Sequence, residues 1–222
     1  LLGIMAGITL IVGCMGAIAY KDMRLIASYN VVIAVGFMLV GLAIGTTVAI
    51  EGSIYYIVHD MIAKAMLFLL VGTMISLTGK TRINEISGLI KNYPLLGWMF
   101  FIVTCSLAGI PPLSGFVGKI LVGQGAIESG AYILLALAFL SSIVVLYSLL
   151  RIFLNSIFGE TIISLEDETP LKFGMIFPIF LLGVGTLALG LGAEVVSVYV
   201  SDAANTLTNP SIYIDAILGK EE

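Results

Sequence analysis

Apolar runs long enough to cross a lipid bilayer recur along almost the whole chain of 222 residues. A membrane-crossing helix needs about 20 mostly apolar residues. The candidate spans cover residues 2–20, 25–50, 53–78, 94–122, 130–157 and 173–199. The mean hydropathy of +1.14 and the 11% of charged residues depart strongly from soluble proteins, in which about a quarter of residues are charged. We therefore expect an all-α polytopic membrane protein of about six helices, with residues 1–222 in a single transmembrane domain.

Lys and Arg side chains gather in alternate connections between these runs. The connections at 21–24 and 79–93 are basic, whereas those at 51–52 and 123–129 hold no Lys or Arg. Cytoplasmic loops of membrane proteins carry an excess of these residues. The pattern predicts a multi-pass protein of the cell membrane whose odd-numbered connections are cytoplasmic and whose two ends are extracytoplasmic. Lys220, near the C-terminus, opposes this orientation weakly.

The run at 94–122 differs from the others in its length and its helix-breaking residues. Its middle reads LAGIPPLSGFVGK, where Pro111 and Pro112 remove backbone donors and clash with the preceding turn. A helix broken at membrane depth persists only where protein or a polar cavity satisfies the freed carbonyls. Such discontinuous helices frequently build transport sites. We expect a broken helix here, with Lys119 just beyond the break.

Ionisable residues interrupt the run at 53–78, which holds His59, Asp60 and Lys64. A lysine at bilayer depth costs roughly 2.5–3.5 kcal/mol on insertion scales, so a chain that retains Lys64 and Lys119 is expected to use them. Asp60 and Lys64 are four residues apart and share one helix face, where they can pair. His59 can exchange protons near neutral pH. These four residues are the predicted proton path.

Structural roles remain open for each of these residues. Lys64 and Asp60 could form a static ion pair that sets helix packing, and His59 could be a hydrogen-bonded packing residue. If 94–122 were one straight helix, Lys119 would lie about 36 Å along it and would snorkel to the far surface. Serines in membrane helices usually bond to the backbone. A water wire is nevertheless an open role for four polar residues of the run at 130–157, namely Ser141, Ser142, Tyr147 and Ser148.

Three segments, KDMRLIASYNVVIAVGFMLVG, HDMIAKAMLFLLVG and LAGIPPLSGFVGKILV, together resemble a known family. They are similar, in this order, to the second half of the proton-translocating antiporter-like membrane subunits. That family comprises the Mrp (Mnh) cation/proton antiporter subunits and related subunits of respiratory complex I. The IPPLSGFVGK form and the ending NPSIYIDAILGKEE are most similar to the D-type subunits of Mrp.

The resemblance implies an inverted-repeat fold of which this chain is the C-terminal portion, in agreement with an opening, LLGIMAG, that reads as the interior of a larger protein. It implies that Lys64 and Lys119 lie on a central hydrophilic axis. Some members of the family have a histidine one turn before the first lysine, whereas His59 precedes Lys64 by five residues. The family's first repeat, with its glutamate and lysine pair, is not contained in this chain.

The sequence and the resemblance together predict a secondary transporter subunit that exchanges Na⁺ or Li⁺ for protons. We do not expect the protein to be an enzyme. The expected partners are other Mrp subunits in a hetero-oligomer, the lipid bilayer and the transported ions; no basic cluster predicts nucleic acid binding. We expect no cofactor and no metal site, since iron–sulfur, haem and flavin motifs are missing. One alternative is a proton-pumping subunit of a complex I-type quinone oxidoreductase. Another is a non-transporting scaffold.

Overall fold

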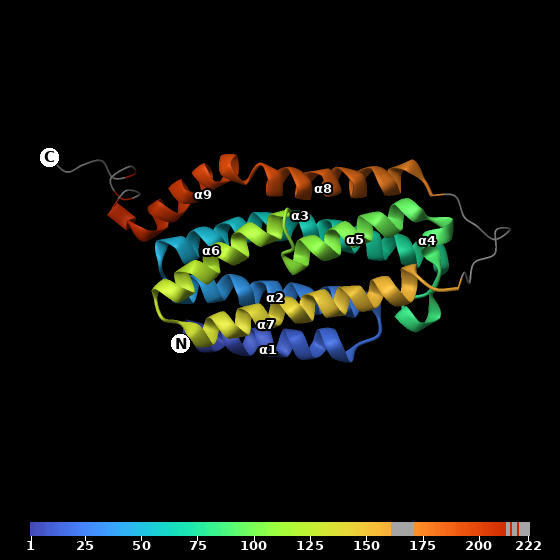
Figure 1. The fold of residues 1–222 in the computed structure, drawn as a ribbon, viewed down its shortest axis with the longest axis horizontal. Coiled ribbons are helices and arrows are strands. Elements are labelled where there is room, and N and C mark those ends of the chain that lie inside the picture. Colours follow the sequence, from blue (N-terminus) through green and yellow to red (C-terminus); the bar gives the residue numbers. More distant parts are fainter. Residues whose placement is uncertain (161–170, 212–213, 215–216, 218–222) are drawn as a thin grey trace.

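The computed structural model is an elongated bundle of roughly antiparallel helices (Figure 1). It describes residues 1–160, 171–211, 214 and 217. Lys220 and part of the NPSIYIDAILGKEE ending therefore lie outside the described residues. The described elements are α1 (Leu2–Ala19), α2 (Met23–Ile44), α3 (Thr47–Thr78), η1 (Ile83–Glu85), α4 (Leu89–Asn92), α5 (Pro94–Ala108), α6 (Ser114–Glu128), α7 (Tyr132–Ile152), η2 (Phe153–Ile157), α8 (Phe173–Leu191) and α9 (Ala193–Thr208).

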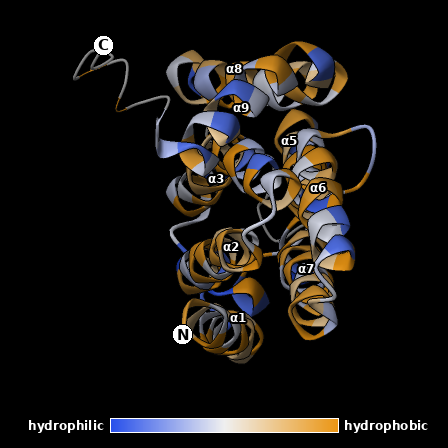
Figure 2. Ribbon diagram, turned by 90° about the vertical axis from the view of Figure 1, so that its left-hand side faces the viewer, coloured by the Kyte–Doolittle hydropathy of each residue, from blue (hydrophilic) through white to orange (hydrophobic). Residues whose placement is uncertain are grey.

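The expected all-α membrane fold is confirmed. Among the described residues, α1, α2, α3, α7 with η2, and α8 are long and apolar enough to cross a bilayer. Seen along the bundle, hydrophobic residues predominate in α1, α2 and α7 (Figure 2). Large apolar side chains such as Ile4, Met15, Ile133 and Leu181 are exposed on the bundle surface. Exposed apolar faces of this kind suit contact with lipid or with other membrane helices. A bilayer core holds no water for free backbone groups, so it favours continuous helices.

The expected connection at Glu51-Gly52 is wrong, because both residues lie inside the 32-residue helix α3. The turn between α2 and α3 lies earlier, where Gly45 ends α2 in a left-handed conformation with φ of 77°. The Thr46 side chain then caps α3 by accepting a hydrogen bond from the Ala49 amide. Glu51 can remain within the helix because its carboxylate accepts a hydrogen bond from the Ser201 hydroxyl of α9.

Two further boundaries differ from the sequence prediction. α6 continues through Gly123 to Glu128, where we expected a break. Gly125 instead packs α6 against α3, since a Cβ atom on it would lie 2.6 Å from the Ala49 Cβ. The close approach of small residues is the usual means of packing helices in lipid. The expected last span at 173–199 is instead two helices, with α8 ending at Leu191 and α9 running at an angle to it (Figure 1).

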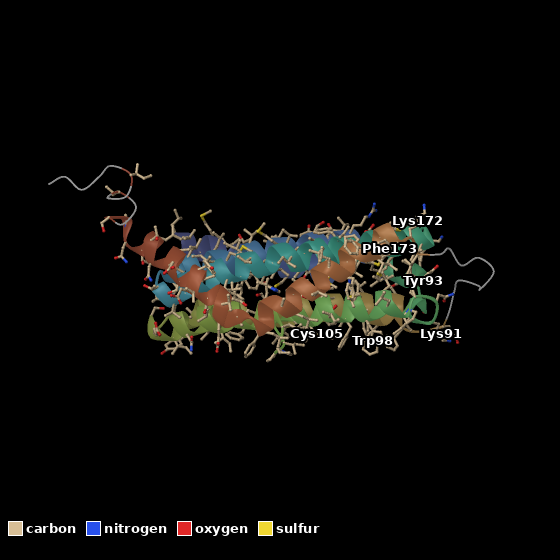
Figure 3. All side chains as sticks on the ribbon, turned by 90° about the horizontal axis from the view of Figure 1, so that it is seen from above. Lys91, Tyr93, Trp98, Cys105, Lys172 and Phe173 are labelled. Atoms are coloured by element: carbon tan, nitrogen blue, oxygen red, sulfur yellow. The ribbon has the colours of Figure 1, made fainter. Side chains whose placement is uncertain are left out.

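The basic connections lie together at one end of the bundle. The Met23 amide donates to the Thr81 carbonyl at 2.9 Å, and the Ile83 amide donates to the Lys21 carbonyl at 3.0 Å. Lys91 and Lys172 lie at the same end of the bundle (Figure 3). This is the right-hand end in Figure 1, which carries α4. The two connections predicted to share one side of the membrane are therefore bonded to each other.

Candidate functional site: a buried charge cluster beside a broken helix

The midpoint of α3 carries three of the predicted site residues into the interior. His59 is fully buried, and Asp60 and Lys64 are 6% and 7% exposed. Lys119 of α6 is also 7% exposed. Within the described part of the chain, these four are the buried members of the Asp, Glu, His, Lys and Arg side chains. The structure thus gathers the buried charge of the molecule along α3 and α6.

Lys64 lies between two acceptors. Its Nζ donates to the main-chain carbonyl of Asn30 on α2 at 2.9 Å, while the Asp60 Oδ1 is 3.7 Å away. The expected contact between Asp60 and Lys64 is therefore present, at ion-pair distance. The Asp60 Oδ1 has no hydrogen-bond partner among the described residues, although it is buried. The pair is open, with the lysine bonded to a carbonyl rather than to its acid.

The fourth expected span is broken, as the Pro111-Pro112 sequence predicted. α5 ends at Ala108, Gly109 follows with φ of 86°, and α6 begins at Ser114. Each half holds 15 residues and is about 22 Å long, too short to cross a core of about 30 Å alone. The two halves meet part-way along the bundle (Figure 1), and both contact α3. Ile110, Pro111 and Pro112 of the break are exposed.

Lys119 satisfies the carbonyls that the break sets free. Its Nζ donates to the main-chain oxygens of Leu107 and Ala108, each at 2.8 Å. These oxygens lie at the C-terminal end of α5, where the helix dipole is negative and attracts a cation. The straight-helix alternative for Lys119 is therefore wrong, because the ammonium points back to the break and does not reach a bilayer surface.

Two aromatic rings lie beside the Lys119 ammonium. The ring centroids of Phe37 on α2 and Tyr56 on α3 are each 5.9 Å from Nζ, within the range of a cation–π interaction. The two rings are in contact, with centroids 4.5 Å apart. Tyr56 also lies one helical turn before Asp60. The rings therefore bound the space around Lys119 on the side facing α2 and α3.

His59 contacts the broken helix rather than Lys64. Its Nδ1 shares a hydrogen bond of 2.7 Å with the hydroxyl of Ser114, the first residue of α6. Ser114 in turn lies 3.5 Å from the Ser106 hydroxyl of α5. The Nε2 atom of His59 is buried without a hydrogen-bond partner in the described structure. His59 thus links α3 to the point at which the broken helix resumes.

Glycines allow α3 and α6 to approach closely enough to bring these groups together. A Cβ atom on Gly52 would lie 2.6 Å from the Val122 nitrogen, and one on Gly118 would lie 3.0 Å from the Tyr56 Cβ. A side chain at Gly52 would collide with the backbone of α6, and one at Gly118 would fit only if its neighbours moved slightly. Among the described residues, His, Cys, Asp and Glu side chains form no group of three or more that could hold a metal ion.

Sequence reasoning missed two polar residues of this site. Asn30, fully buried, supplies the carbonyl for Lys64, and Ser114, also fully buried, bonds to His59. Each carried a signal in the sequence. Asn30 is the one side-chain amide in the mostly apolar run 25–50, and Ser114 lies two residues after the helix-breaking prolines.

Residues 1–154 match the family model described as "NADH:quinone oxidoreductase/Mrp antiporter, TM". The chain belongs to this family. Among curated members, it is 47% identical over 219 residues to the D-type Na(+)/H(+) antiporter subunit of Bacillus subtilis strain 168. That alignment covers 96% of this chain and 43% of the relative, so the chain spans less than half the length of that relative.

Solved structures of the NADH:quinone oxidoreductase/Mrp antiporter family share the fold. A chain in the Mrp complex from Dietzia sp. DQ12-45-1b superposes with a TM-score of 0.91 at 30% identity, covering 98% of this chain and 49% of that one. A chain in respiratory complex I from Thermus thermophilus superposes with a TM-score of 0.83 at 28% identity, covering 93% and 44% respectively. The family thus includes both antiporter and respiratory assemblies.

Proposed function

We propose that this chain is part of a D-type subunit of an Mrp complex that exchanges Na⁺ or Li⁺ for protons. The observation that carries the proposal is the pair of buried lysines held by main-chain carbonyls beside a broken helix. The 47% identity to a D-type antiporter subunit and the structural match to an Mrp complex support it. Other Mrp subunits are the proposed partners, and the protein acts as a secondary transporter.

Lys119 is suited to both holding and releasing a proton. An ammonium group has three N–H donors, and two of them bond to the carbonyls of Leu107 and Ala108. A neutral amine keeps two donors, so loss of one proton leaves both carbonyls satisfied. The site therefore accommodates the charged and the neutral lysine without leaving a buried polar group unpaired.

Lys64 completes the proposed path. Its ammonium bonds to the Asn30 carbonyl and faces the open carboxylate of Asp60, so a small movement exchanges one acceptor for the other. His59 and Ser114 connect the same stretch of α3 to the break. In our proposal protons pass between Lys64 and Lys119 by way of water and these polar groups, and movement at the break couples them to cation exchange elsewhere in the complex.

The bonded basic connections define the proposed orientation. Lys21 and Arg82 lie in the connections that pair at one end of the bundle. The excess of Lys and Arg on the cytoplasmic side of membrane proteins assigns this end to the cytoplasm of a bacterial cell. The start of α1 lies at the opposite, extracytoplasmic end (Figure 1).

The proposal is tested in everted membrane vesicles that contain the assembled complex with this chain. After a pH gradient has been established, addition of Na⁺ or Li⁺ is expected to dissipate it without an electron donor. Vesicles in which the gradient is indifferent to both cations would contradict the proposal.

A proton-pumping subunit of a quinone-linked respiratory complex is the second candidate function. The match to a chain of Thermus thermophilus complex I favours it, since that chain shares the same helical arrangement. The redox chemistry would then belong to partner subunits. Proton movement in the same vesicles would require an electron donor and would be insensitive to Na⁺, which separates the two candidates.

A further inference from the structure

Asn30 joins α7, α2 and Lys64 through its hydrogen bonds. Its side-chain amide donates to the Ser148 hydroxyl of α7 at 3.0 Å and to the Ile26 carbonyl of its own helix at 2.8 Å. Its main-chain carbonyl accepts from the Lys64 ammonium at 2.9 Å. Asn30 and Ser148 are both fully buried. An uncharged link therefore runs from α7 to the carbonyl that holds a buried cation.

We propose that Asn30 is a positioning residue for Lys64, and that Ser148 is its anchor on α7. The inference rests on the proposed function, in which Lys64 carries protons. The bond between the Asn30 side chain and Ser148 fixes the rotation of α2, and with it the position of the Asn30 main-chain carbonyl. This carbonyl holds the Lys64 ammonium away from direct contact with Asp60. α7, which supplies none of the four buried ionisable residues, thereby takes part in setting when Lys64 releases its proton.

The distances around Lys64 show why this anchor matters. The ammonium is 2.9 Å from the neutral carbonyl of Asn30 and 3.7 Å from the Asp60 Oδ1, which lacks a hydrogen-bond partner among the described residues. A direct contact with the carboxylate would favour the charged lysine more strongly than a contact with a carbonyl, since opposite charges at short range stabilise each other's ionised forms. Movement of the Asn30 carbonyl away from Lys64 would let this contact close.

The charged and titratable groups around Lys64 are few. Asp60, His59 and Tyr56 lie on its own helix, and Lys119 lies on α6. The other helices of the described structure place no buried Asp, Glu, His, Lys or Arg side chain against it. Because Asn30 and Ser148 do not titrate, an altered pH dependence after loss of their hydrogen bond would arise through the position of Lys64.

Ser148 and Ser141 offer a matched pair of variants for the test. Both serines are buried in α7 and donate to a carbonyl of the same helix, Ser148 to Val145 and Ser141 to Ala138. Ser148 alone of the two is bonded to Asn30. Each would be changed to alanine in the full-length subunit, and the cation-dependent exchange of the assembled complex would be measured in vesicles as a function of pH.

We expect the Ser148→Ala complex to assemble normally. The pH at which its exchange is half-maximal should rise by about half a unit, a shift of the size that the free energy of one buried hydrogen bond produces. Ser141→Ala should keep the wild-type profile, and Ser148→Thr, which retains a hydroxyl, should restore it. A Ser148→Ala complex with the wild-type profile, or one that fails to assemble, would overturn the inference. Absence of exchange in the wild-type complex would instead contradict the proposed function.

Discussion

The ammonium of Lys119 lies 2.8 Å from the main-chain carbonyl of Leu107, at the C-terminal end of the half-helix that precedes the break. A carbonyl at a helix C-terminus carries partial negative charge, so the backbone supplies what an acidic side chain would otherwise provide. The break thus creates the binding site of the lysine, and the position of Lys119 depends on the conformation of residues 107–109.

Gly109 tests this dependence. A Cβ atom at this position would lie 2.7 Å from the Lys119 Cδ, and the residue has φ of 86°. Gly109→Ala should therefore displace Lys119 and reduce exchange on the order of 10- to 100-fold, because the transfer of a proton depends steeply on the placement of the reacting groups. Exchange would be measured in vesicles at equal amounts of assembled complex.

Gly79→Ala is the control for backbone strain. Gly79 ends α3 with φ of 67° and has open space around its missing Cβ. The left-handed conformation costs an alanine roughly 1–2 kcal/mol at either glycine. We expect the Gly79 variant to be slightly less stable and fully active. Equal loss of exchange in both variants would show that strain, and not the contact with Lys119, is responsible.

Tyr55 links α3 to α8 by a hydrogen bond. Its buried hydroxyl donates to the Leu189 carbonyl at 2.6 Å. Tyr55→Phe should lower the stability of the complex by about 1 kcal/mol, because the hydroxyl is lost and the carbonyl loses its partner. Thermal unfolding of the purified complex checks this, with Tyr199→Phe as the control since Tyr199 is 74% exposed. An unchanged melting temperature for Tyr55→Phe would contradict the role of this bond.

Asp22 caps α2 in the basic connection, and hydrogen bonds from the Arg24 side chain lower its pKa to about 2. A lowered pKa means that the carboxylate contributes stability above its unfolded pKa of about 3.9, and that this is lost as the pH falls toward 2. Asp22→Ala should therefore reduce stability by about 1 kcal/mol, the usual value of a cap. In melting curves, the difference in stability between the wild-type protein and Asp22→Ala should be constant from about pH 6 to 9, because Asp22 stays ionised there. A difference that changes with pH within this range would contradict this prediction.

The sequence predicted those parts of the site that depend on local spacing. The contact of Asp60 with Lys64 follows from helical periodicity, and the break follows from the two prolines. The end of α2 was misplaced because Glu51 looked like a boundary, and the Ser201 hydroxyl that accommodates it lies 150 residues away. The partners of Asn30 were likewise beyond reach, since they come from α3 and α7.

In our proposal the buried charges Asp60 and Lys64 serve proton transfer and are not merely packing contacts. Changing Lys64 to Met together with Asp60 to Leu removes both charges, and the replacement of buried ion pairs by hydrophobic residues is frequently neutral or stabilising. The decisive measurement is cation-driven proton exchange by this double variant in proteoliposomes, with Lys80→Ala as the exposed-lysine control. We expect the double variant to assemble without exchange, whereas wild-type exchange would show that these charges do not carry protons.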